Sequence, residues 1–365
     1  MRRRVLFLFP FPSLGGGGGA QRVFSTLLRH LDRERFELHL ALLQPSGADD
    51  DDIPEDVIVH DLGVKRARYT IPRIARLVRR LKPDTVLSTL GHMNIALLLG
   101  KWMLPRKTRI LIRESTTPSV FLRQGTEYPR TWTVLYRWLY KRADMVISLS
   151  DAMMKDLAEN FRVPPEKLVR IYNPVDVEMI QRLAQLQGTP FSSAGPHLVA
   201  AGRFVRDKGF DLLIDALPQV LASFPQARLT LPGEGPLEGE LQDQVRRLGI
   251  GDAVSFPGMQ KNPWRYFHHA DLVVVPSRFD GLANVTLEAL AVGTPVIATD
   301  CPGAIREIRA SDERVMLVSP EDPTALAEGI VSALRLPRMG REQPAQLSKF
   351  NLRQIVSEYS RLLEG

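Results

Sequence analysis

Short apolar runs alternate with segments whose apolar residues recur at helical spacing, and this pattern limits the possible folds most strongly. In the first half, the runs that predict strands cover residues 5–9, 36–43, 57–62, 85–88, 109–113 and 145–150. Helical spacing over 21–31 and 71–81 predicts helices between them. Short, continuously apolar strands separated by helices are typical of a parallel sheet covered on both faces. We therefore expect an α/β domain.

The same alternation starts again after a polar stretch. Strands are predicted over 198–201, 228–232, 254–257, 272–276, 295–298 and 315–318, with helices over 210–221, 237–248, 264–269, 285–291 and 324–334. The predicted domains are residues 1–175 and 198–345, joined by a linker over 176–197. Residues 346–365 are predicted to form a C-terminal helix that packs back toward the first domain. We expect two doubly wound, Rossmann-like domains that face a central cleft, with ligands at the carboxyl ends of the strands.

Composition excludes several classes of protein. A 365-residue chain with 44% hydrophobic residues can bury two cores, which excludes global disorder. The single cysteine, Cys301, excludes an internal disulfide framework and a cysteine-built metal site. The apolar run after Arg2–Arg4 is too short for a secretory signal, and no stretch approaches the length of a membrane-spanning helix. We expect a cytoplasmic chain, which could attach peripherally to the inner face of the cell membrane.

Glycines follow the first strand and precede the first helix, over Gly15–Gly19. Glycines let backbone N–H groups approach a phosphate, and a helix N-terminus adds a favourable dipole. No Gly-Lys-Ser/Thr follows, and no acidic residue ends the second strand, so this is neither a Walker A loop nor a dinucleotide fingerprint. A flexible glycine linker is the alternative, which the position between strand and helix disfavours.

Two loops of the second domain suggest a diphosphate and a diol. Arg203 and Lys208 are five residues apart after its first strand, where two cations could converge on a pyrophosphate. The second loop, 280–283, leads into a helix for which Asn284 is the predicted N-cap. Glu288 lies one turn into that helix beside apolar neighbours, where a ribose diol would explain a carboxylate. The alternative for the two cations is an ordinary surface loop.

The order of these motifs resembles the retaining, nucleotide-sugar-dependent glycosyltransferases with two Rossmann-like domains, and family 4 in particular. The resemblance covers nearly the whole chain. The segments that carry it are 18–23, 173–176, 202–209, 233–237, 256–263, 270–281, 284–289, 293–296 and 300–308. It implies the GT-B architecture, a nucleotide sugar as donor substrate, and no cofactor or catalytic metal.

The resemblance also implies roles for individual residues. Arg203 and Lys208 would clamp the donor diphosphate, Asp280 would contact sugar hydroxyls and Glu288 would hold the ribose. Catalytic residues would be His92, Arg203, Lys208 and Asp280. The implied donor-binding residues are Gly18, Gly19, Gly202, Arg203, Lys208, Gly233, Gly258, Asp280, Gly281, Leu282, Ala283, Asn284, Val285 and Glu288.

This sequence departs from the family pattern at three positions. Asp280 stands where Glu is usual, Leu282-Ala283 replace Phe-Pro or Phe-Gly, and Gln21 replaces Glu. These differences bear on which sugar is transferred, and on whether the chain is active. Two alternatives therefore stay open: a sugar-nucleotide epimerase on the same scaffold, and a non-catalytic partner subunit.

Acceptor-side candidates follow two strand ends of the first domain. His92 and Asn94 follow the strand over 85–88, and Glu114 follows the strand over 109–113. His92 could contact the sugar or the acceptor, with a structural histidine as the alternative. Glu114 could orient the acceptor hydroxyl, with a loop salt bridge as the alternative.

Charge is divided unequally between the two halves. Residues 1–175 hold 29 Lys and Arg against 18 Asp and Glu, whereas residues 176–365 hold 19 against 23. Between Lys65 and Lys82 there are eight basic residues and no acidic ones, with Ile71, Ile74, Leu77 and Val78 interleaved. This pattern favours attachment to anionic lipid, and an acceptor that is a glycan or a polyprenyl-diphosphate-linked sugar. Nucleic acid is not expected, because aromatic platforms are not interleaved with the cations. We expect a UDP-linked donor and a role in bacterial surface polysaccharide or glycoconjugate synthesis.

Overall fold

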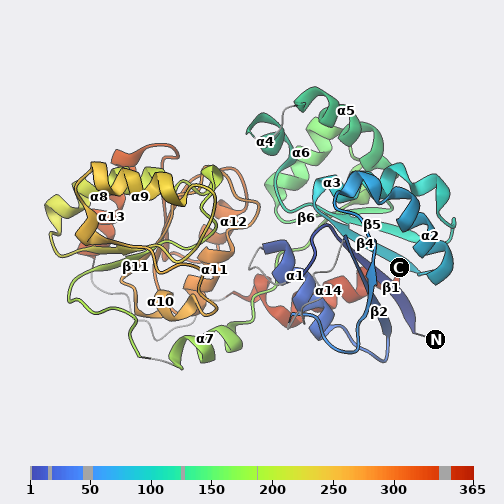
Figure 1. Cartoon of the computed structure of the whole chain (residues 1–365), viewed down its shortest axis with the longest axis horizontal. Helices are drawn as coiled ribbons and strands as arrows, with labels where there is room; N and C mark the ends of the chain where they lie inside the picture. The colour runs from blue at the N-terminus through green and yellow to red at the C-terminus, as the bar shows by residue number, and fades with distance from the viewer. Residues whose placement is uncertain (1, 15–18, 44–51, 125–127, 187, 337–346) are drawn as a thin grey trace. The chain divides into compact units, whose positions relative to one another are not determined.

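A computed structural model describes residues 2–14, 19–43, 52–124, 128–186, 188–336 and 347–365 (Figure 1). The described chain forms two compact units. Unit 1 comprises residues 1–174 and 352–365, and unit 2 comprises residues 175–351. Each unit is built on one parallel sheet, as the alternation of short apolar runs and helices predicts.

Unit 1 has a seven-stranded sheet in the order β3-β2-β1-β4-β5-β6-β7. Its strands are β1 (Arg3–Phe9), β2 (Phe36–Leu42), β3 (Ile58–Asp61), β4 (Thr85–Thr89), β5 (Arg109–Arg113), β6 (Met145–Ser148) and β7 (Leu168–Arg170). The order reverses at β1 and β4, which pair in parallel. Reversal of strand order is the topological switch point at which doubly wound folds bind ligands beyond the carboxyl ends of the strands.

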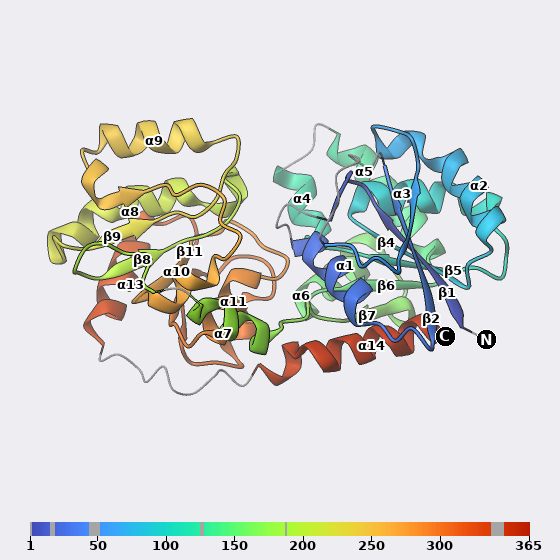
Figure 2. The ribbon, with the colours of Figure 1, turned by 60° about the horizontal axis from the view of Figure 1, so that its bottom comes forward.

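Helices cover both faces of this sheet. Figures 1 and 2 show α2, α3 and α5 on one face and α1 and α14 on the other. The helices of unit 1 are α1 (Gly19–His30), α2 (Ile71–Leu81), α3 (Gly91–Leu99), α4 (Pro118–Gln124), α5 (Pro129–Leu139), α6 (Asp151–Phe161) and α14 (Leu352–Glu364). The apolar face of α2 packs inward, because Ile74, Leu77 and Val78 are buried. Contact of these three residues with lipid, as the sequence pattern suggested, is therefore wrong.

The C-terminal helix α14 belongs to unit 1. Thr85 of β4 donates its hydroxyl to the carbonyl of Leu363 at 3.1 Å, and Arg109 of β5 donates to the carbonyl of Leu362 at 2.9 Å. Arg35 forms an ion pair with Glu364. These contacts join the last turn of α14 to the residue before β2 and to the first residues of β4 and β5.

Unit 2 has a six-stranded parallel sheet in the order β10-β9-β8-β11-β12-β13. Its strands are β8 (His197–Val199), β9 (Arg228–Thr230), β10 (Val254–Ser255), β11 (Leu272–Val275), β12 (Val296–Thr299) and β13 (Val315–Val318). Its helices are α7 (Val177–Gln185), α8 (Phe210–Ser223), α9 (Glu238–Arg247), α10 (Trp264–His269), α11 (Asn284–Ala291), α12 (Ile305–Arg309) and α13 (Pro323–Arg335). Helices α8, α9 and α13 cover one face, and α7, α10 and α11 cover the other (Figure 1).

The stretch expected to be a linker, 176–197, contains helix α7. The Asp176 side chain accepts a hydrogen bond from the backbone N–H of Met179, which caps the helix N-terminus. Ile180 and Ala184 are four residues apart and both are buried. The linker prediction is therefore wrong for 177–185. The Gly, Pro and Ser residues that favoured a linker follow the helix, between Gly188 and Pro196.

Within the described residues, no helix is long and apolar enough to cross a membrane.

Candidate functional site

Four loops of unit 2 meet at the carboxyl edge of its sheet. They follow β8, β9, β10 and β11, and they carry most of the donor-binding candidates. Gly202 N–H donates to the Pro232 carbonyl at 3.1 Å, and Gly233 N–H donates to the Gly258 carbonyl at 3.0 Å. These backbone hydrogen bonds therefore hold together the three loops that carry Gly202, Gly233 and Gly258.

Glycine at position 233 is required by the close approach of these loops. Its φ is +159°, and a Cβ there would lie 2.0 Å from the carbonyl oxygen of Gly202. A side chain at position 233 would push the loop after β8 away from the loop after β9. The lack of a side chain at Gly233 therefore lets the two loops approach each other closely.

Two of the candidates, Lys208 and Asp280, form an ion pair. Lys208 closes a single 3-10 turn, η5 (Arg206–Lys208), and its Nζ lies 2.5 Å from Oδ2 of Asp280. Burial lowers the pKa of Lys208, but the Asp280 carboxylate outweighs burial, so the pKa is raised overall. Lys208 therefore carries its positive charge at physiological pH. Arg203, on the same loop, is exposed.

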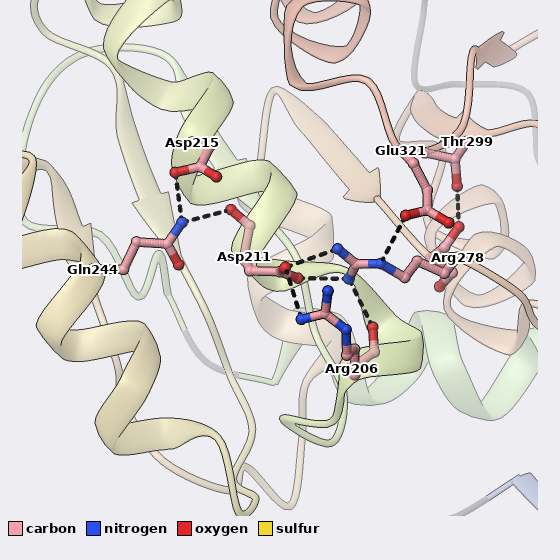
Figure 3. A network of polar contacts seen from close by, with 8 residues as sticks. Arg206, Asp211, Asp215, Gln244, Arg278, Thr299 and Glu321 are labelled. Atoms are coloured by element: carbon pink, nitrogen blue, oxygen red, sulfur yellow. Dashed lines mark hydrogen bonds and ion pairs between the residues drawn. The ribbon is translucent and has the colours of Figure 1, made fainter. Parts of the chain in front are cut away.

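An arginine not predicted from the sequence fixes the position of this pair. Arg278 is 8% exposed and donates both terminal nitrogens to Asp211, at 2.7 and 2.8 Å. It also donates to the carbonyl of Arg206 at 2.9 Å, and its backbone N–H donates to the carbonyl of Asp207 at 2.8 Å. Figure 3 shows Arg278 between Asp211 and Glu321, with Arg206 alongside. The loop after β11, which carries Asp280, is thereby joined to η5, which carries Lys208.

The loop that follows Asp280 runs into helix α11. Its backbone is held by Asp280 N–H, which donates to the Pro302 carbonyl at 3.2 Å, and by Ala304 N–H, which donates to the Gly281 carbonyl at 3.2 Å. Residue Ala283, and not Asn284, is the N-cap, so the predicted capping role of Asn284 is wrong. Asn284 is the first helical residue, since the chain adopts helical geometry one residue earlier than expected. Leu282 and Ala283 are buried.

Glu288 is buried in α11 with 6% of its surface exposed. The indole N–H of Trp264 donates to its Oε2 at 3.1 Å. One helical turn separates Glu288 from Asn284, so the carboxylate lies next to the N-terminal turn of the helix. The oxygens of a carboxylate are hydrogen-bond acceptors, which is the chemistry that the hydroxyls of a ligand require.

Cys301 is not a nucleophile at this edge. Its side chain is buried. Burial first, and then the nearby Asp280 carboxylate, raise the pKa of the thiol to about 12. The thiol is therefore protonated at neutral pH, and the thiolate is the reactive form of cysteine.

In unit 1, the candidate His92 lines a hollow of about 470 Å³. The hollow lies beyond the carboxyl ends of β1, β2, β3 and β4. It is lined by Pro10, Phe11, Pro12, Leu43, Val64, Lys65, Arg66, Ala67 and His92. His92 is exposed on this wall, its ring lies against that of Phe11 with centroids 6.5 Å apart, and desolvation by the surrounding residues lowers its pKa. His92 is therefore a mainly neutral imidazole on the wall of an apolar hollow with two cations.

Backbone strain precedes His92. Leu90 has a φ of +70°, a conformation that residues with side chains rarely adopt. Such strain concentrates at functional sites, where the surrounding structure compensates for it. It turns the chain sharply from β4 into α3 and places His92 in the first turn of the helix.

Asn94 and Glu114 are brought together, but inside unit 1. They are 0% and 3% exposed. Asn94 Nδ2 donates to Glu114 Oε1 at 3.0 Å, and the Tyr140 hydroxyl donates to the same oxygen. Neither residue lines the hollow beside His92. They link α3 to β5 and to the turn after α5, and so hold the helix that carries His92. The alternative, a loop salt bridge of Glu114, is not found among the described residues, and the neighbouring Arg113 donates to Thr89 and Asn173.

We predict that Glu114→Gln stabilises unit 1 more at pH 8 than at pH 5. Burial raises the pKa of Glu114 to about 7, from 4.5, despite the hydrogen bonds from Tyr140 and Asn94. The folded state thus binds a proton more tightly than the unfolded state, so its stability falls as pH rises from 4.5 through about 7. Glutamine keeps the acceptor oxygen but cannot ionise.

Chemical unfolding of both proteins at the two pH values measures this effect. We expect the free energy of unfolding of the variant to exceed that of the wild type by about 1–3 kcal/mol at pH 8. The prediction would be contradicted if the free energies of unfolding of the two proteins differed by the same amount at pH 5 and at pH 8.

Gly19 opens helix α1, directly after the segment 15–18. Gly18 lies outside the described residues. Among the described residues, no group of three or more His, Cys, Asp or Glu side chains is placed to hold a metal ion.

Comparison with known proteins decides the family. The family model for Glycosyltransferase Family 4 matches residues 17–179, and that for Glycosyl transferases group 1 matches residues 195–335. The chain is 30% identical, over 92% of its own length and 90% of the relative, to N-acetylgalactosamine-N,N'-diacetylbacillosaminyl-diphospho-undecaprenol 4-alpha-N-acetylgalactosaminyltransferase of Campylobacter jejuni. The chain belongs to the family 4 glycosyltransferases. The family confirms the resemblance found in the sequence.

Solved structures show that this glycosyltransferase has the GT-B fold. HepE of Anabaena, in complex with UDP and glucose, matches 100% of both chains with a TM-score of 0.79 at 21% identity. Sucrose-phosphate synthase of Thermosynechococcus elongatus matches 100% of this chain and 98% of its own, with a TM-score of 0.79 at 20% identity. The predicted pair of Rossmann-like domains is thus confirmed, and the epimerase alternative has no support among these relatives.

Proposed function

We propose that this glycosyltransferase moves a hexosyl or N-acetylhexosaminyl group from a UDP-linked donor, with retention of configuration, to a lipid-linked or glycan acceptor. The observation that carries the proposal is the meeting of Lys208, Asp280 and the first turn of α11 at one edge of unit 2. A cation beside a helix N-terminus suits a diphosphate, because the ammonium group and the positive end of the helix dipole both favour negative charge. The Campylobacter relative is named for a diphospho-undecaprenol acceptor, and HepE was solved with UDP, which supports both substrate classes.

The donor would be held through separate groups of unit 2. Glu288 would accept hydrogen bonds from the ribose hydroxyls, and the glycine-rich turns at 233 and 258 would border the base. Lys208 and Arg203 would neutralise the diphosphate, and Asp280 would accept from a sugar hydroxyl. Lys208 then serves two purposes, since the cation that faces the diphosphate also orients Asp280. Participation of Gly19 and of its neighbour Gly18 stays a prediction.

The chemical step would break the bond between the anomeric carbon and the diphosphate oxygen. The acceptor hydroxyl attacks that carbon from the same face, and its proton passes to the departing diphosphate. Negative charge grows on the diphosphate as the bond breaks, so a cation held in advance stabilises the transition state more than the ground state. We propose that protein cations supply this charge without a catalytic metal or other cofactor.

The acceptor would bind in unit 1 beside His92. The hollow combines apolar walls with Lys65 and Arg66, which fits a molecule that is part apolar and part anionic. The neutral imidazole of His92 can accept or donate one hydrogen bond to a sugar hydroxyl. A lipid-linked acceptor would be reached from a bilayer surface, so peripheral attachment to the inner face of the cell membrane belongs to the same proposal.

A panel of nucleotide sugars tests the proposal. Competent transferases hydrolyse their own donor slowly when no acceptor is present, so we expect release of UDP from one donor of the panel. Release from no donor, together with no thermal stabilisation by any of them, would favour the alternative of a non-catalytic partner subunit. Release of a free UDP-linked epimer would favour the epimerase.

A further inference from the structure

Segments that follow three strands of the unit 2 sheet meet at the side chain of Arg278. This residue lies in the loop after β11, and its terminal nitrogens donate to both carboxylate oxygens of Asp211, in the first turn of α8. Its Nε lies 3.5 Å from Oε2 of Glu321, in the segment between β13 and α13 (Figure 3). Because the guanidinium group is engaged by carboxylates of the protein, we expect any effect of Arg278 on a substrate to pass through other residues.

Arg278 also binds the main chain of the two residues that precede Lys208. Its Nη1 donates to the carbonyl of Arg206 at 2.9 Å, and its backbone N–H donates to the carbonyl of Asp207 at 2.8 Å. These two residues and Lys208 are the whole of η5. The side chain and the backbone of one arginine therefore hold the short turn that ends in the candidate cation.

A close approach of the same two loops holds the other end of this turn. Gly209 directly follows η5, and its φ is +65°. A Cβ at this position would lie 2.0 Å from the carbonyl oxygen of Pro276, which comes directly after β11. Only a glycine allows this approach. Lys208 thus lies between two points at which its backbone is fixed against the loop after β11.

The contacts of Arg278 require a guanidinium group. The hydrogen bonds with Asp211 raise the pKa of Arg278, and they outweigh the effect of burial on Asp211, so the pKa of that carboxyl is lowered overall. Both side chains are therefore charged at physiological pH. A planar guanidinium can contact both oxygens of a carboxylate and a carbonyl at once, whereas a lysine has a single nitrogen.

We propose that Arg278 is a positioning residue for sugar transfer, which holds η5 so that the ammonium group of Lys208 meets the charge that develops on the departing diphosphate. The inference rests on the proposed function, in which Lys208 neutralises the diphosphate. A group that is held in place before the reaction stabilises developing charge without reorganisation. A misplacement of about 1 Å can reduce a rate by roughly 100-fold, even when the substitution lies away from the reacting atoms.

Steady-state kinetics of Arg278→Lys with the donor found in the panel tests the proposal. We expect kcat to fall about 10- to 100-fold, because lysine keeps the charge but cannot hold η5. The affinity for UDP, measured by calorimetry, should fall far less than kcat, because Glu288 and the glycine turns stay in place.

Arg314→Lys is the matched control. Arg314 also donates twice to one carboxylate, that of Asp312, at 3.0 and 2.7 Å, and its side chain is 12% exposed. It directly precedes β13, at the amino edge of the sheet and away from η5. The control variant should therefore keep wild-type kcat.

Double substitutions separate positioning from a general contribution to folding. If Arg278 acts through Lys208, Arg278→Lys should change kcat by no more than about twofold in the Lys208→Met background. In the Glu288→Ala background it should lower kcat by its full factor. The proposal would be overturned by the same loss in the wild-type and Lys208→Met backgrounds, by a folded Arg278→Lys enzyme with wild-type kcat, or by an equal loss in Arg314→Lys.

Asp211→Asn replaces Arg278→Lys if thermal unfolding shows that the lysine variant is not folded. Asparagine keeps one acceptor oxygen for Arg278, so the loss of kcat should be smaller, and it should again disappear in the Lys208→Met background. A loss that persists in that background would overturn the proposal. Absence of donor turnover by the wild type would refute the proposed function and this inference together. Turnover that Lys208→Met abolishes and Arg278→Lys leaves unchanged would refute the positioning role alone.

Discussion

Lys208→Met is expected to reduce kcat for sugar transfer about 100- to 1000-fold, the loss that follows removal of one preorganised group from a developing negative charge. The Lys208 ammonium lies 2.5 Å from Asp280, and the raised pKa keeps it charged. Methionine retains the length of the side chain without the charge. The substitution also leaves the Asp280 carboxylate without its cation. We therefore expect it to weaken the contact of Asp280 with the sugar as well as the stabilisation of the diphosphate.

Steady-state kinetics with the donor found in the panel measures this loss. Arg247→Met, which removes an exposed cation of α9, is the control and should keep wild-type kcat. Asp280→Asn should lower activity less than Lys208→Met, because the lysine keeps its charge and gains freedom to follow the diphosphate. A Lys208→Met enzyme with wild-type kcat would show that the cation does not act on the leaving group.

Glu288→Ala is expected to weaken binding of UDP roughly 100-fold or more. A hydrogen bond to a charged group contributes about 1.5–3 kcal/mol, and a ribose offers two hydroxyls to this carboxylate. Only 6% of the Glu288 surface is exposed, so water replaces a lost ribose contact poorly. Glu288→Gln should fall between the wild type and the alanine variant, because one acceptor oxygen remains.

Calorimetric titration with UDP measures the second effect, after thermal unfolding has shown that each variant is folded. Trp264→Phe replaces the indole, whose N–H Glu288 accepts at 3.1 Å, by a smaller ring without a donor, and should weaken binding less than Glu288→Ala. Binding of UDP to Glu288→Ala within about twofold of the wild type would exclude Glu288 as the ribose ligand.

All strands except β7 were predictable because they are short, mainly apolar runs. Helices α3, α4, α5, α6 and α12 were not predicted. Of these, α4 and α12 have seven and five residues, which offer few positions from which to recognise a helical period. Helix α7 was included in the predicted linker because the Gly, Pro and Ser residues between Gly188 and Pro196, which follow it, favoured a linker for the whole stretch 176–197. Strand β7 has three residues at half-buried or exposed positions, so its sequence shows no apolar run.

The residue types of the candidate site were predictable, but the partners were not. Lys208 and Asp280 are 72 residues apart, and only the sheet places β8 beside β11. Arg278 lies in the segment 270–281, which carries the family resemblance. Its bidentate contact with Asp211 could not be predicted, because it also depends on β8 lying beside β11. Asn94 and Glu114 follow strand ends, which favoured an open site, but the packing of α3 and Tyr140 over them excludes solvent.

The central claim is that unit 2 binds a nucleotide-sugar donor through Lys208 and Glu288. The most direct measurement is calorimetric titration of the wild type, Lys208→Met and Glu288→Ala with UDP and with the UDP-sugar selected by the donor panel. The account predicts saturable binding of both ligands to the wild type, clear weakening by Glu288→Ala, and loss of turnover in Lys208→Met. Absence of binding to the wild type, or equal affinity in all three proteins, would contradict it.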